Sequence, residues 1–153
     1  MGEQVNQAWL RVRSELLPKG DWEDTLRLLA TEAAEGMGSS VPAQRVFDDA
    51  VEREQTEPTY IGMGMAVPHT RVEGVTRAGV YLGISQGGIP WPQEEAHIVA
   101  LLIVPWERPE LHLQLLARLA RWRRGLAEES LSTLAQTPGA LEGALHAAFA
   151  GLV

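Results

Sequence analysis

The sequence IVALLIV, residues 98–104, is the longest strongly aliphatic run in the chain. An apolar run without polar alternation is typical of a strand that is covered on both faces. We therefore predict that this run forms an internal strand of a sheet. Weaker patterns predict further strands at Trp9–Leu16, Met65–Val67 and Ala78–Ile84.

Helical patterns occupy most of the remaining chain. Asp21 is placed to cap a helix, and Pro42 and Pro109 suit the first turns of two others. The predicted helices are Trp22–Glu35, Pro42–Arg53, Glu110–Trp122 and Pro138–Phe149, with a further helical stretch near Ala127–Leu134. Strands interleaved with helices indicate an α/β fold. We expect residues 1–153 to form a single domain with a mixed, mostly parallel β-sheet flanked by helices on both faces.

The charge of the chain argues against nucleic acid as a partner. The formal net charge is −7, whereas phosphate backbones are bound by clustered Lys and Arg side chains. The only basic run, residues 118–124, contains four arginines at the end of a predicted helix. Cations interact favourably with the helix dipole there, so we interpret this run as a solvated helix end.

The residue types present exclude several kinds of chemistry. The chain contains no cysteine, which excludes a disulfide framework, a thiol nucleophile and cysteine-ligated zinc. The four histidines lie far apart in the sequence and form no short zinc motif, and no G-x-S-x-G nucleophile elbow occurs. We expect no metal and no cofactor, and we interpret His97 and His146 as structural residues.

We expect a cytoplasmic protein that does not insert into a membrane. The first residues include Glu3 and lack a basic stretch followed by an apolar one. The aliphatic run 98–104 is too short to cross a bilayer.

His69 follows a short predicted strand and is the residue best suited to chemistry. Residues 55–64 form a predicted loop, and Pro68 ends the strand, so His69 lies at a strand exit. A neutral imidazole is nucleophilic near physiological pH, and a phosphorylated ring nitrogen is a good leaving group. Gly62 and Gly64 would allow backbone amides to approach a phosphoryl group closely. On its own, a histidine after proline in a loop is more often a turn residue than a functional one.

The residues around His69 form a wider pattern. Glu54 is followed after six residues by Ile61-Gly62 and, after two more, by the segment Met65 to His69. This pattern resembles the phosphorylation-site signature of the mannitol/fructose family of phosphotransferase-system IIA domains (EIIA type 2), which includes nitrogen-regulatory IIA proteins. The resemblance continues in register through residues 88–91 and 112–120, and covers roughly residues 16–149.

The resemblance implies a phosphohistidine relay, and hence a phosphotransferase. In that family the histidine matching His69 receives phosphate on its tele nitrogen from the phosphohistidine of the carrier HPr or of a paralogous carrier. It then passes the phosphate to a IIB cysteine. The family's site also contains an arginine that matches Arg53, which would neutralise phosphoryl oxygens with a permanently charged, bidentate head. A second histidine matches His112, which would hydrogen-bond a phosphoryl oxygen or hold the His69 ring.

Other features bear on which partners this chain would have. Because the chain has no cysteine, the IIB acceptor and its membrane IIC are expected on separate polypeptides. Thr70 stands where the family usually has a small residue, so its hydroxyl can crowd or hydrogen-bond the site. The alternative is a regulatory phosphoprotein of the nitrogen-regulatory kind, which binds and controls a target protein without sugar transport. No sugar can be named, because residues 57–60 lean toward the mannitol branch while 112–120 fit fructose and nitrogen-regulatory proteins equally.

Overall fold

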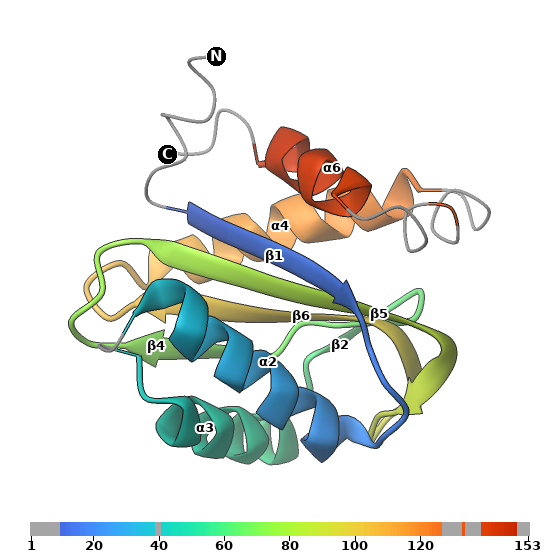
Figure 1. Ribbon diagram of the computed structural model, residues 1–153, viewed down its shortest axis with the longest axis horizontal. Helices are drawn as coiled ribbons and strands as arrows, with labels where there is room; N and C mark the ends of the chain where they lie inside the picture. Colours follow the sequence, from blue (N-terminus) through green and yellow to red (C-terminus); the bar gives the residue numbers. More distant parts are fainter. Residues whose placement is uncertain (1–9, 39–40, 127–132, 134–138, 150–153) are drawn as a thin grey trace.

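The aliphatic run 98–104 lies in β6 (Glu95–Pro105), the central strand of the sheet in the computed structural model (Figure 1). All residues of the run are buried. On one side β6 pairs antiparallel with β5 (Ala78–Pro90), and on the other it pairs parallel with both β3 (Met65–Ala66) and β4 (His69–Val72). The prediction of an internal strand is confirmed. The structure describes residues 10–38, 41–126, 133 and 139–149.

Two outer strands complete the sheet in the described part of the chain. β1 (Leu10–Leu16) pairs parallel with β5, and β2 (Tyr60–Gly62) pairs antiparallel with β3. The resulting order is β1-β5-β6-β3-β2, with β4 also beside β6. Three of these five pairings are parallel, so the expected mixed, mostly parallel sheet is confirmed.

Helices cover both faces of the sheet, as predicted (Figure 1). One face is covered by α2 (Trp22–Met37) and α3 (Ala43–Thr56). The other face is covered by α4 (Glu110–Arg124) and α6 (Ala140–Ala148). None of the helices in the described ranges is long and apolar enough to span a membrane.

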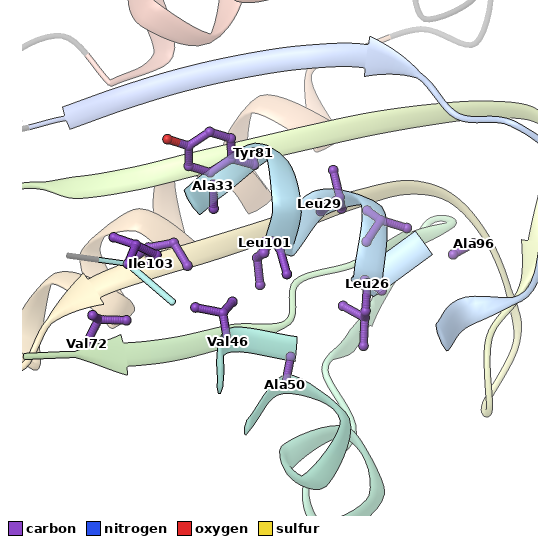
Figure 2. Close-up of a cluster of buried hydrophobic side chains, with 14 of the residues drawn as sticks. Leu26, Leu29, Ala33, Val46, Ala50, Val72, Tyr81, Ala96, Leu101 and Ile103 are labelled. Atoms are coloured by element: carbon purple, nitrogen blue, oxygen red, sulfur yellow. The ribbon is translucent and has the colours of Figure 1, made fainter. Parts of the chain in front are cut away.

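Neighbouring residues of β6 pack against opposite helical layers. Leu101 and Ile103 contact the core that α2 and α3 form with residues such as Leu26 and Val46, as Figure 2 shows. Leu102, between them, belongs to the core on the α4 and α6 side. Full burial of one such side chain stabilises the fold by roughly 1.5–3 kcal/mol. Because both faces are buried, the strand has no polar alternation.

The capping of α2 agrees with the sequence. The Asp21 carboxylate accepts the Asp24 N–H at 2.9 Å, and the Asp24 carboxylate accepts the Asp21 N–H at 3.2 Å. This reciprocal capping box satisfies two N–H groups that the first turn would otherwise leave unpaired. The helix ends at Met37 rather than Glu35, and Gly38 terminates it with a φ of 96°.

The prediction for residues 55–69 was wrong in three respects. α3 continues to Thr56, and β2 forms within the segment predicted as a loop. The strand does end before Pro68, since β3 stops at Ala66, but a further strand, β4, begins at His69. Proline has no N–H to donate, but the Pro68 carbonyl accepts the Leu102 N–H at 2.9 Å and keeps the chain against β6.

Two further boundaries differ from the predictions. β5 extends beyond Ile84 to Pro90, with an irregular register between Ile84 and Ile89. The last described helix begins at Ala140. Its predicted start at Pro138, and the predicted stretch 127–134 apart from Thr133, lie outside the described residues.

Candidate functional site

His69 is fixed to the central strand by its backbone. It is the first residue of β4 and lies opposite Leu102 in the parallel pairing with β6. Its side chain is half-buried. The ring nitrogen Nδ1 is inaccessible to solvent and has no hydrogen-bond partner among the described residues. The Nδ1 side of the ring is therefore closed to a group that approaches from outside.

His112 stacks on the His69 ring. It lies in the first turn of α4, which the buried residues Leu111 and Leu115 hold against the sheet. The two ring centroids are 3.7 Å apart, and the ring planes differ by 23°. At this separation a positive charge on one ring opposes protonation of the other.

The surroundings hold both rings in the neutral form. The pKa of His69 is lowered to about 4, chiefly by burial and then by positive charge on His112 and Arg53. The Val67 carbonyl acts in the opposite direction, since it favours the protonated ring. Burial and Arg53 also lower the pKa of His112, while Glu57 opposes this shift. His69 consequently has a free nitrogen lone pair throughout the neutral pH range.

These shifts can be measured directly. We expect an NMR titration of the imidazole resonances to show His69 titrating at about pH 4. His112 should titrate below the ordinary histidine pKa of about 6.5. An ordinary pKa for His69 would contradict the stacked, half-buried geometry.

The same shift makes the stability of the fold depend on pH. The unfolded chain protonates this ring at about pH 6.5, whereas the folded protein does so only near pH 4. Between these values the unfolded state binds more protons, so the free energy of unfolding decreases as the pH falls from about 6.5 toward 4. Urea titrations should show a shallower decline for His69→Gln than for the native chain.

Arg53 enters the site from the last turn of α3. It lies close enough to both imidazoles to lower their pKa values. Its guanidinium forms no hydrogen bond or ion pair with any residue that the structure describes. With Glu57 and Thr70 it lines a cavity of about 410 Å³. Neither His69 nor His112 lines this cavity, and the link of Arg53 to the two imidazoles is the effect of its positive charge on their pKa values.

Glu54 anchors the end of α3 next to Arg53. Its side chain is 1% exposed, and its carboxylate accepts the Thr59 N–H at 2.9 Å and the Thr59 hydroxyl at 2.6 Å. These bonds tie the last turn of α3 to the segment that leads into β2. The buried glutamate of the sequence pattern thus organises the backbone beside the site.

Loss of this anchor should destabilise the fold. We expect Glu54→Ala to lower the free energy of unfolding by about 2 kcal/mol, because the buried Thr59 N–H and hydroxyl lose their acceptor. Urea denaturation measures the change. Glu52→Ala, on the exposed side of the same helix, is the matched control and should change stability by less than about 0.5 kcal/mol. Equal effects of the two variants would contradict the anchoring role.

The backbone groups of Gly64, in the turn between β2 and β3, are engaged in hydrogen bonds within the fold. Gly62, Met63 and Gly64 have φ values of 96°, 54° and 73°, a left-handed run that glycine adopts most readily. The Gly64 N–H donates to the Tyr60 hydroxyl at 2.9 Å, and the Gly64 carbonyl accepts the His97 N–H at 2.7 Å. The Gly64 N–H is therefore already bonded, and the expectation that Gly64 would let its backbone amide approach a phosphoryl group was wrong.

The basic run 118–124 is only partly a solvated helix end. Arg123 is 6% exposed, and its Nε donates to the Met63 carbonyl at 3.0 Å. Arg118 donates through Nη1 to the Ala148 carbonyl at 3.0 Å. The interpretation was wrong for these two residues. The helical spacing could have predicted the burial of Arg123, because residues four apart lie on the same helix face and Arg123 follows the buried Leu119 by four.

Thr70 does not crowd the His69 ring. Successive residues of a strand point to opposite faces of the sheet, and Thr70 is 1% exposed on the α3 side. Its hydroxyl donates to the Asp49 carboxylate at 3.3 Å. Sequence reasoning missed Asp49, although its position four residues before Arg53 on a helix was a usable signal.

The two remaining histidines lie outside this arrangement. His97 is in β6, where its Nδ1 lies 3.0 Å from the Ser85 carbonyl oxygen. His146 is in α6. Across the described ranges, no three residues among His, Asp and Glu are grouped so as to hold a metal ion.

The fold and the site together define a class of protein. It is an α/β domain in which a strand of the sheet carries a neutral histidine, His69. A second histidine, His112, stacks on this ring, and the charge of Arg53 acts on both. The chain belongs to the EIIA 2 family of the phosphoenolpyruvate-dependent sugar phosphotransferase system, whose family model matches residues 16–137. Phosphoryl transfer is thus the general role of the family.

Two relatives match part of the sequence. The chain is 31% identical over 78 residues to the fructose-specific EIIA component of Haloferax volcanii. The matched segment covers 49% of this chain and 51% of that protein. It is 28% identical over 94 residues to the 2-O-α-mannosyl-D-glycerate-specific EIIABC component of Escherichia coli, 58% of this chain and 14% of that protein. The chain therefore spans about half of the first relative and a small part of the second.

Solved structures share the fold. The nitrogen regulatory protein IIA-Ntr of Neisseria meningitidis superimposes with a TM-score of 0.72 at 21% identity, over 93% of this chain and 98% of that one. IIA mannitol of Escherichia coli gives 0.68 at 22% identity, over 86% and 94%. The Escherichia coli complex of IIAMtl with phosphorylated IIBMtl also gives 0.68, at 20% identity, over 88% and 94%. These likenesses confirm the predicted α/β fold.

Proposed function

We propose that His69 carries a phosphoryl group from a phosphohistidine donor to an acceptor protein, as the IIA component of a sugar phosphotransferase system. The observation that supports this most directly is the neutral His69 ring, stacked on His112 with Arg53 beside it. Neutral imidazole is the nucleophilic form, and the depressed pKa keeps it populated at neutral pH.

In this proposal the transfer step uses the Nε2 atom of His69. Because Nδ1 is buried, the Nε2 (tele) lone pair attacks the phosphorus atom of the donor phosphohistidine. The new P–N bond forms as the P–N bond of the donor breaks, and that electron pair remains on the donor ring. In the second step the thiolate of a IIB cysteine attacks the phosphorus. The S–P bond forms as the P–Nε2 bond breaks, and His69 leaves as a neutral imidazole that keeps the electron pair.

Arg53 and His112 have distinct roles in this proposal. During transfer, negative charge is spread over the three non-bridging phosphoryl oxygens. The Arg53 guanidinium stabilises that charge and can bind two oxygens at once. His112 holds the His69 ring by stacking, and its N–H can donate to a phosphoryl oxygen.

The partners we propose are proteins. The donor is HPr or a paralogous phosphocarrier, and the acceptor is the cysteine of a IIB component that works with a membrane IIC. Two exposed apolar residues support protein docking at this site. Leu113, 67% exposed, follows His112, and Trp106, 46% exposed, lines the same cavity as Arg53. We further propose that residues 1–153 form one IIA domain that acts in the cytoplasm.

The decisive experiment is phosphorylation by the purified relay. The native chain is incubated with phosphoenolpyruvate, enzyme I and HPr, and its intact mass is measured. The incubation is repeated with a paralogous phosphocarrier in place of HPr. We expect the addition of one phosphoryl group with one of the two donors, and a chain that stays unmodified with both would contradict the proposal. Loaded protein is then mixed with candidate IIB proteins. Transfer supports the role in sugar uptake, whereas loading without transfer to any IIB supports the regulatory alternative.

A further inference from the structure

Asp49 lies midway between two arginines of α3. Arg45 precedes it by four residues and Arg53 follows it by four, and all three line the same cavity. On a helix, an acidic residue pairs better with a base four residues toward the carboxyl end than with one four residues before it. Helix geometry therefore favours an ion pair between Asp49 and Arg53.

The structure shows a different partner for Asp49. Its carboxylate accepts the Thr70 hydroxyl of β4 at 3.3 Å. Within the described ranges, Arg53 forms no ion pair at all. The Asp49 carboxylate thus bonds to Thr70 on β4 instead of forming the ion pair with Arg53 that the helix spacing favours.

We propose that Thr70 is a positioning residue, whose hydroxyl holds the Asp49 carboxylate against β4 and leaves the Arg53 guanidinium free for the phosphoryl group on His69. This inference rests on the proposed phosphocarrier function. It assigns a role to the residue that directly follows the histidine. A small residue without a hydroxyl at this position would allow the Asp49 carboxylate to form an ion pair with Arg53.

The surroundings make Thr70 a rigid donor. It is 1% exposed and lies opposite Ile103 in the pairing with the central strand. Its branched side chain has restricted rotation, and a buried hydroxyl must find an acceptor. Of the other cations lining the cavity, Arg71 places its guanidinium 4.2 Å from the centre of the Trp106 ring. Arg71 is therefore already engaged by an aromatic face.

The test removes the hydroxyl while keeping the shape of the side chain. We expect Thr70→Val to slow phosphoryl loading from phospho-HPr about twofold to threefold, the factor that corresponds to one helical ion pair. Thr70→Ser, which keeps the hydroxyl, should load at the native rate. The double variant Thr70→Val with Asp49→Asn should recover the native rate. The neutral amide that replaces the Asp49 carboxylate cannot form an ion pair with Arg53, so the guanidinium stays free for the phosphoryl group.

A matched control separates this effect from the loss of any buried hydroxyl. Thr25 is 4% exposed in α2, and its hydroxyl donates to the Asp21 carbonyl at 3.0 Å. Thr25→Val should leave loading unchanged. If Thr70→Val does not fold, Thr70→Ala removes the same donor with a smaller side chain.

A second measurement does not require phosphorylation. His69 is faced by His112 and Arg53, and His112 by Arg53 and Glu57. Pairing of Asp49 with Arg53 would weaken the positive charge near both rings, so NMR titration of Thr70→Val should show both histidine pKa values raised. The double variant should return them toward the native values.

The outcomes distinguish the two proposals. If the native chain fails to load, the proposed function fails, and the NMR titration still tests Thr70. If the native chain loads, but Thr70→Val changes neither the loading rate nor the histidine pKa values, the positioning role is overturned. A slowed Thr70→Val that Asp49→Asn does not rescue also overturns it, since the hydroxyl would then act independently of Asp49.

Discussion

Replacing His69 by glutamine is expected to abolish phosphoryl loading from phospho-HPr. Glutamine matches the polarity and approximate size of the imidazole, but its amide nitrogen has no lone pair available for attack on phosphorus. β4 pairs with β6 through its backbone, so we expect the substitution to keep that pairing. Intact-mass spectrometry after incubation with phosphoenolpyruvate, enzyme I and HPr should show a modified native chain and an unmodified variant.

A second histidine variant controls for indirect effects. His97 lies in β6 outside the proposed site, so His97→Gln should load like the native chain. Circular dichroism and urea denaturation of His69→Gln should report a folded protein. A folded His69→Gln variant that still acquires a full phosphoryl group would place the acceptor on another residue and overturn the proposed function.

The elements predicted well from the sequence are those whose signals are local. The run 98–104 identified the central strand because a strand buried on both faces needs an apolar residue at every position. Asp21 identified the start of α2 because a cap is made within four residues. In both cases the residues that determine the structure are neighbours in sequence.

The elements predicted poorly depend on distant partners. β4 contains a histidine, a threonine and an arginine, and it is a strand because β6 lies beside it. β2 has three residues and pairs with β3 through an irregular register. Such short segments have no periodicity that could distinguish them from the loop predicted there. Pro68 correctly indicated the end of β3, but no local pattern indicated that β4 begins directly after it, at His69.

The site shows the same division. Arg53 and His112 were expected from the resemblance, and the structure places both beside His69. The contact of Thr70 with Asp49 joins residues 21 apart in sequence, and that of Arg123 with Met63 joins residues 60 apart. Neither contact has a pattern within one element. Only the packing of α3 on β4, and of α4 on the turn before β3, brings these pairs together.

Replacing Arg53 by alanine is expected to slow phosphoryl loading about 100-fold, the usual consequence of removing one preorganised group that stabilises transition-state charge. Arg53→Lys should fall between the native chain and Arg53→Ala, because lysine keeps the charge but cannot bind two oxygens at once. The fold should survive, with a change in unfolding free energy below about 0.5 kcal/mol, since Glu54 rather than Arg53 anchors the end of α3.

The rate must be measured where protonation does not contribute. Arg53 lowers the pKa of both His69 and His112, so its removal should raise both values toward about 6.5. At about pH 8 both rings are neutral in either protein, and a slower rate there reports lost charge stabilisation instead of lost nucleophile. Arg45→Ala removes an arginine from the same cavity, two turns away on α3, and should slow loading far less. Equal rates for Arg53→Ala and the native chain at this pH would mean that the phosphoryl oxygens are neutralised by another group.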